Sequence, residues 1–186
     1  SILKAPVFAH PNAVSSRESG DPIKTFAEIA AQNVHMPMPP VKIDREISDG
    51  DTIEVGSQQI EVWHTPGHTD SQLAFQLGEL LLSGDNIYRD GSVGAIDAHH
   101  GSDIPAFIRS LQRIRDSDIK WLLPSHGPVF QKDDELLAKT ISRLEHYLTL
   151  ADFGTCAPHW PLIDEWDREL AEGRMPTEVS ASEHHA

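Results

Sequence analysis

The segment Val62–Asp70 constrains the fold more than any other part of the sequence. It reads Val-Trp-His-Thr-Pro-Gly-His-Thr-Asp, so a β-like run ends just before a Pro-Gly pair that forces a tight turn. His68 follows this turn and projects from a rigid strand end, a position suited to a metal ligand or an acid–base group. Two later predicted strands run into Ser-Gly-Asp and Pro-Ser-His-Gly. Three strand ends therefore supply three candidate ligands: His68, Asp85 and His126.

Hydrophobic periodicity outlines the remaining elements. Apolar alternation predicts two hairpins, over 53–64 and 73–82, and apolar stripes at helical spacing predict helices over 22–33, 103–114 and 133–150. Short apolar runs predict buried strands at 5–9 and 119–123, whereas 86–101 reads as a loop above the strand ends. Hairpins followed by helix, strand and helix predict an α/β fold, layered in the α+β manner, with a sheet covered by helices and ligands along one sheet edge.

Charge and composition exclude several classes of partner. The 186 residues carry a formal net charge of −14, which argues against electrostatic binding to nucleic acid or to an anionic membrane. No apolar stretch is long enough to span a bilayer and no signal peptide is evident, so we expect a soluble chain, either cytoplasmic or exported after processing. The lone Cys156 excludes an internal disulfide and a thiolate metal cluster.

The order and spacing of three motifs carry a family resemblance. His64-Thr-Pro-Gly-His-Thr69, Ser83-Gly-Asp85 and Pro124-Ser-His-Gly-Pro128 together resemble the metallo-β-lactamase-fold hydrolases, over roughly residues 5–150. The resemblance implies an αββα sandwich, of which this chain would be the C-terminal part, with one or two metal ions at the edge between its sheets. Asp85 points to the glyoxalase II-like and lactonase-like branch.

The resemblance assigns roles to individual residues. His68, Asp85 and His126 would bind two divalent ions, most simply Zn²⁺, with Mn²⁺ or Fe also compatible with nitrogen and carboxylate donors. Asp85 would bridge both ions and fix the reactive hydroxide. Tyr88 would act in catalysis and contact the substrate carbonyl, or pack as a structural tyrosine. The second-choice substrate contacts in the 86–101 loop are His99 and His100, whereas His64 shares an apolar strand face and is expected to be structural.

The sequence departs from this family in one respect. The signature His-x-His-x-Asp-His is absent from all 186 residues, and relatives carry it before a helix and a strand like 5–9, so we expect the chain to begin just after it. Three donors do not complete a closed dinuclear site with a reactive water. The substitutes that the sequence offers are His10, His35, His99 and His100. We therefore expect enzyme activity from the complete chain rather than from these residues alone.

These inferences lead to one preferred function and two alternatives. We expect a metal-dependent hydrolase that attacks a small ester, lactone or thioester carbonyl with a metal-bound hydroxide. The alternatives are a non-catalytic, partner-binding remnant of the fold and a di-iron redox member. The domain is expected over 1–152, followed by an extension over 153–186 that is partly helical and then frayed. Expected partners are a small-molecule substrate and, in a homo-oligomer, further copies of the chain.

Overall fold

A computed structural model describes residues 5–25, 28–29, 34–96, 101–148, 168 and 172. Contacts within the chain group Ser1–Glu145 into one compact unit and His146–Ala186 into another. The predicted division into 1–152 and 153–186 stays a prediction, because most of the second segment lies outside the described residues. Within the described residues, every helix is too short or too polar to cross a bilayer.

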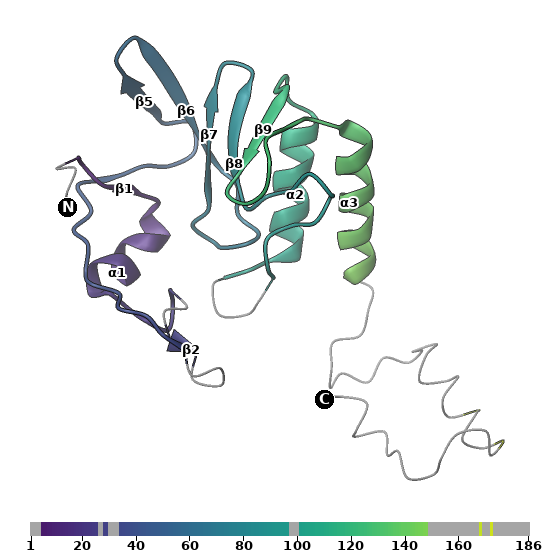
Figure 1. The fold of residues 1–186 in the computed structure, drawn as a ribbon, viewed down its shortest axis with the longest axis horizontal. Coiled ribbons are helices and arrows are strands. Elements are labelled where there is room, and N and C mark those ends of the chain that lie inside the picture. The colour runs from purple at the N-terminus through teal and green to yellow at the C-terminus, as the bar shows by residue number, and fades with distance from the viewer. Residues whose placement is uncertain are drawn as a thin grey trace. The chain divides into compact units, whose positions relative to one another are not determined.

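A six-stranded mixed sheet forms the centre of the first unit (Figure 1). Its spatial order is β10-β9-β8-β7-β6-β5, and all neighbours are antiparallel except β8 and β9, which run parallel. Both predicted hairpins are confirmed, as β5–β6 and β7–β8. The strands are β5 (Thr52–Val55), β6 (Gln58–His64), β7 (Leu73–Leu77), β8 (Leu80–Gly84), β9 (Trp121–Pro124) and β10 (Phe130–Gln131).

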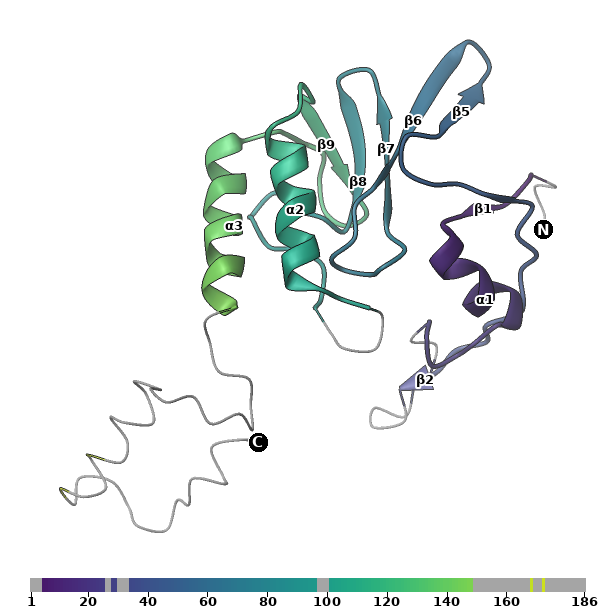
Figure 2. The ribbon, with the colours of Figure 1, turned by 180° about the vertical axis from the view of Figure 1, so that it is seen from behind.

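Two amphipathic helices pack on one face of this sheet, and they lie side by side in both ribbon views (Figure 2). α2 (Ile104–Arg115) begins where the sequence predicts, because the Asp103 side chain accepts a hydrogen bond from the Ala106 amide and caps the helix. α3 (Asp134–Tyr147) confirms the third predicted helix. The core between helices and sheet is apolar, with members such as Leu81, Leu122, Phe107, Leu111, Leu137 and Ile141.

The opposite face of the sheet is also apolar but open among the described residues. Along β8, Leu81 is fully buried, whereas its neighbours Leu80 and Leu82 are 36% and 44% exposed. Trp121 on β9 lies level with Leu80 and is 40% exposed. Strand periodicity therefore gives this sheet two apolar faces, one of which the helices cover. The chain has the mixed α/β fold, layered as helices on a sheet, that its sequence predicts.

The region before the sheet corrects one prediction. A helix is absent from the described part of 22–33, where 22–25 form a turn and β2 (Glu28–Ile29) pairs with β3 (Val34–His35). The helix instead is α1 (Pro11–Ser19), which lacks a buried face and so has no apolar stripe to reveal it. Ile23, part of the presumed stripe, is 64% exposed. The predicted strand at 5–9 is confirmed in its last two residues: β1 (Phe8–Ala9) pairs with β4 (Arg45–Glu46).

Candidate metal centre

The sheet topology brings the carboxyl ends of three strands to the same end of the sheet. β6 and β8 both pair antiparallel with β7 and therefore run in the same direction, and β9 pairs parallel with β8. The carboxyl ends of β6, β8 and β9 thus lie together. The segments that leave these ends carry the three predicted ligands, and the structure places His68 and His126 beside the carboxylate of Asp85.

The turn that carries His68 is held against the beginning of α2. Gly67 lies so close to the helix that a Cβ atom built on it would approach the Phe107 Cα to 2.5 Å. Three successive carbonyl groups of the turn accept hydrogen bonds from α2 and its cap: Pro66 O from Ser110 Oγ at 2.7 Å, Gly67 O from the Asp103 amide at 3.0 Å, and His68 O from Ser102 Oγ. Helix α2 thereby positions His68.

The His68 ring is oriented by the loop that follows β8. Its Nδ1 lies 2.6 Å from the carbonyl oxygen of Ala95, and because a carbonyl oxygen only accepts, Nδ1 is the donor. In the neutral ring, Nε2 then carries a lone pair, and it lies 3.9 Å from Asp85 Oδ2. This is the arrangement in which a backbone carbonyl fixes the tautomer of a metal-binding histidine.

Asp85 is the centre of the cluster. Its Oδ1 accepts a hydrogen bond from the Tyr88 hydroxyl at 2.6 Å and a second from His126 Nδ1 at 2.9 Å, while Oδ2 faces His68. The Asp85 side chain is 20% exposed, whereas that of His126 is 76% exposed. The Tyr88 and His126 rings meet edge to face, with centroids 6.1 Å apart. The Asp85 carboxylate therefore lies next to three residues that the sequence analysis singled out separately, Tyr88, His126 and His68.

The protonation states follow from these contacts. Burial would raise the pKa of Asp85, but the hydrogen bonds from Tyr88 and His126 and the charges of both histidines outweigh it and lower that pKa. Burial, followed by the hydrogen bond to Asp85 and its negative charge, raises the pKa of the Tyr88 phenol above its ordinary value. Asp85 is thus an ionised acceptor and Tyr88 a neutral donor at pH 7.

Comparison with known proteins identifies the family. The sequence profile described as the metallo-beta-lactamase superfamily matches residues 2–126, which is more than half of the chain and includes all three strand ends. The chain belongs to the metallo-beta-lactamase superfamily. The resemblance inferred from the three motifs is thereby confirmed.

Individual relatives agree with this assignment. An acyl-coenzyme A thioesterase, MBLAC2 of Gallus gallus, is 33% identical over 102 residues, covering 52% of this chain and 36% of the relative. The crystal structure of TTHA1623 in a di-iron-bound form is 30% identical with a TM-score of 0.57, covering 75% of this chain and 65% of the other. The metallo-beta-lactamase family protein TTHA1429 from Thermus thermophilus is 23% identical with a TM-score of 0.60, covering 78% and 55%. The chain thus spans between about a third and two thirds of these proteins.

The donor atoms of His68, Asp85 and His126 are of the chemical types that bind the metal ions typical of this superfamily, and part of their geometry also fits. Imidazole nitrogen and carboxylate oxygen suit Zn²⁺ and iron. Two ligands of one zinc ion lie at most about 4.2 Å apart, since each bond is roughly 2.1 Å long. The 3.9 Å between His68 Nε2 and Asp85 Oδ2 satisfies this limit. Among the described residues, however, no group of three or more His, Cys, Asp or Glu side chains is arranged to hold an ion on its own.

The other predicted histidines either have surroundings different from this cluster or fall outside the described residues. His99 and His100 fall outside the described residues. His64 Nε2 lies 2.9 Å from the Asp70 backbone carbonyl, which only accepts, so this ring nitrogen is the donor. The ring of His10 stacks on that of His64 with centroids 4.1 Å apart. His10 also caps α1, and His35 lies in the short strand β3.

Sequence reasoning missed the residues that support the cluster. Gly94 lies so close to the site that an added Cβ would approach the Asp85 Cβ to 2.8 Å and the His68 Cγ to 2.9 Å. Asn86 is fully buried and donates to Ser83 O at 2.6 Å and to Thr65 Oγ1 at 3.0 Å. The sequence did offer a signal for Asn86, because it is a polar residue directly after the predicted ligand Asp85. The aperiodic loop around Gly94 offered none.

Proposed function

We propose that the complete protein is a metal-dependent hydrolase that cleaves a small ester, lactone or thioester. The observation that carries the proposal is the ionised Asp85, held at the sheet edge between two imidazoles and a phenol in a chain of the metallo-beta-lactamase superfamily. His68, Asp85 and His126 are the residues that would hold metal. When bound, such ions polarise a carbonyl and lower the pKa of a bound water to about 7.

The chain's own residues provide orientation and proton donation. The Ala95 carbonyl holds the His68 ring with Nε2 toward the carboxylate, and Asp85 stays charged because its pKa is lowered. Tyr88 stays protonated because its pKa is raised, so its hydroxyl is a donor for the oxygen of a substrate carbonyl as negative charge develops there. The Tyr88 hydroxyl would exchange its present acceptor, Asp85, for the substrate oxygen.

Thioesters are the first substrate class to test. A relative that is 33% identical over 102 residues is named an acyl-coenzyme A thioesterase, which supports a carbonyl bonded to sulfur as the point of attack. Because the chain spans 36% of that relative, the substrate is part of the proposal. Iron belongs among the metals tested beside zinc and manganese, since the relative with a di-iron-bound form is 30% identical.

A second candidate is a non-catalytic, partner-binding module. One observation favours it: within the described part of the chain, no three metal-binding side chains are arranged to hold an ion. The two candidates differ in the metal content of the natural, full-length protein. A hydrolase retains about two ions per molecule through dialysis, whereas a module retains none.

The deciding experiment compares metal content and hydrolysis in matched variants. The full-length protein is loaded separately with zinc, manganese and iron, dialysed, analysed by mass spectrometry for metals, and assayed with a simple acyl thioester. We expect Asp85→Ala to lose metal and to reduce turnover by at least a hundredfold. Asp118→Ala, which removes an exposed carboxylate between α2 and β9, should change neither. Absence of bound metal in the unmodified protein, or full turnover by Asp85→Ala, would contradict the proposal.

A further inference from the structure

A cavity of about 560 Å³ adjoins the candidate metal centre. Two of its lining residues, Tyr88 and His126, donate hydrogen bonds to the Asp85 carboxylate. A molecule in this cavity therefore lies beside the proposed reaction centre. The other lining residues are Arg89, Asp90, Ser92, Gly127 and Pro128.

Arg89 gives this cavity an available positive charge. The side chain is exposed, and its guanidinium makes no hydrogen bond or ion pair with the residues that the structure describes. The neighbouring carboxylate of Asp90 is engaged elsewhere, since it accepts hydrogen bonds from the Ser92 amide at 3.0 Å and the Ser92 hydroxyl at 2.6 Å. The chain has a net charge of −14, so an arginine without a carboxylate partner in the described part of the chain is a local site of positive charge to which an anionic ligand can bind.

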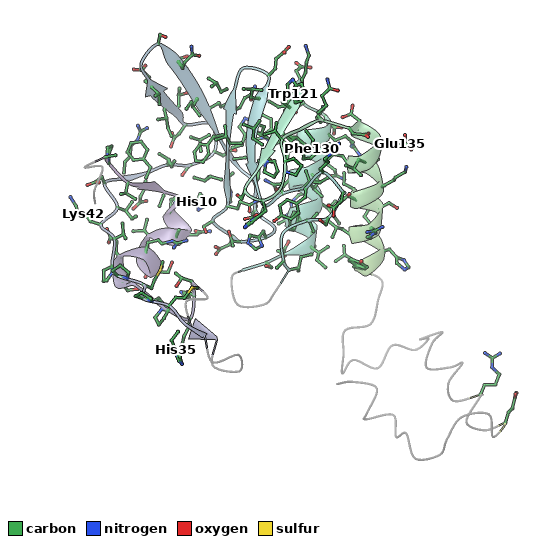
Figure 3. All side chains as sticks on the ribbon, viewed as in Figure 1. His10, His35, Lys42, Trp121, Phe130 and Glu135 are labelled. Atoms are coloured by element: carbon green, nitrogen blue, oxygen red, sulfur yellow. The ribbon has the colours of Figure 1, made fainter. Side chains whose placement is uncertain are left out.

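Arg89 also lines a second cavity, of about 430 Å³, whose other lining residues are apolar except for Gln131 and Asp133. This cavity lies along β9 and the edge strand β10, where Figure 3 marks Trp121 and Phe130. Trp121 is 40% exposed and Val129 is 54% exposed, so both offer apolar surface to a ligand. The shared Arg89 therefore links the cavity beside Asp85 to a surface on which the apolar side chains of Trp121 and Val129 are exposed.

We propose that Arg89 binds an anionic group, a carboxylate or a phosphate monoester, on the substrate hydrolysed beside Asp85, and that an apolar part of the same substrate lies against Trp121. A guanidinium binds either group through two parallel charge-assisted hydrogen bonds, which a neutral group cannot form. Arg89 thus sets specificity for acidic substrates. That this anion belongs to a hydrolysed substrate rests on the proposed function, but binding of the anion requires neither metal nor turnover.

The test measures binding and needs no catalysis. Dissociation constants of benzoate, phenyl phosphate and the neutral benzamide are determined by ligand-observed NMR with the full-length protein. We expect one or both anions to bind at least tenfold more tightly than benzamide, and Arg89→Gln to abolish that difference. Preference for benzoate or for phenyl phosphate identifies which anion the site accepts. Trp121→Ser should weaken all ring-bearing probes alike.

A matched variant controls for the loss of charge. Arg143→Gln removes an exposed arginine from α3 and should leave every dissociation constant unchanged. Equal binding of anions and benzamide, or equal anion binding by Arg89→Gln and the unmodified protein, would overturn the inference. Failure of the proposed function has a different signature, because a protein that hydrolyses no thioester can still bind benzoate through Arg89.

Discussion

Replacement of Gly67 by alanine tests whether the turn that carries His68 is packed against α2 as described. Gly67 has a φ of 149°, a backbone angle that residues with a side chain rarely adopt. The added Cβ would also approach the Phe107 Cα to 2.5 Å, so a rotation of the Phe107 side chain cannot relieve the overlap. Relief requires the turn to move away from the helix.

The expected loss of stability has two parts. Holding alanine at such a φ costs about 1–3 kcal/mol. Forcing a methyl group into a packed contact costs roughly another 1–3 kcal/mol. The total of about 2–6 kcal/mol is a large part of the 5–15 kcal/mol by which a domain is typically stable. We therefore expect Gly67→Ala to unfold at a much lower urea concentration, if it folds at all.

Gly56→Ala provides the matched control. Gly56 lies in the β5–β6 turn with a φ of 61°, and no atom lies within 4 Å of a Cβ built on it. Its replacement costs only the left-handed backbone conformation, about 1–2 kcal/mol. The free energies of unfolding of both variants and the unmodified protein are measured by urea denaturation followed by circular dichroism. Equal losses for the two variants would refute the close packing of the turn on α2.

Three further variants test other parts of the structure. Asn86→Ala should cost about 2–4 kcal/mol of unfolding free energy, measured in urea, because it leaves buried hydrogen-bond partners unpaired. Tyr88→Phe should raise the pKa of Asp85 in the metal-free protein, read by carboxyl ¹³C NMR, because it deletes a hydrogen bond to the ionised form. Burial and the charge of His64 lower the pKa of His10 below 6.5, and they outweigh the opposing effect of the Asp70 carboxylate. As the pH falls, His10 therefore gains its proton in the unfolded chain before it does so in the folded chain. The free energy of unfolding should therefore be unaffected by the protonation of His10 above pH 6.5 and should fall below that pH. His10→Asn retains a capping side chain for α1 and should make this fall smaller. Urea denaturation at pH 7.5, 6 and 5 measures the difference.

Most of the elements that were predictable from the sequence have a buried face. β6, the β7–β8 hairpin and the helices α2 and α3 contribute residues to the core, so their apolar residues recur at the period of the element, whereas β5 has no buried residue and was predicted from its alternation and the turn that joins it to β6. α1 has no buried residue, and its remaining signals were only Pro11 at its beginning and Gly20 at its end. The presumed helix over 22–33 rested on apolar residues such as Ile23, which is exposed, so periodicity alone was misleading there.

The site divides in the same way between regular and irregular structure. His68, Asp85 and His126 could be brought together on paper because each follows a strand, and strand direction determines which ends meet. Their roles as metal ligands remain predictions. The Ala95 carbonyl, which orients the His68 ring, lies in a loop without periodicity, where only three-dimensional contacts determine position.

These contacts explain why the two oxygens of Asp85 are not equivalent. Oδ1 accepts from Tyr88 and His126, so its hydrogen-bonding capacity is largely used. Oδ2 instead faces His68 Nε2, and with Nδ1 donating to Ala95 a neutral ring presents a second lone pair to the carboxylate. Two lone pairs facing each other are favourable only with a cation or a proton between them. A cation or a proton in the gap between Asp85 Oδ2 and His68 Nε2 would therefore stabilise the cluster.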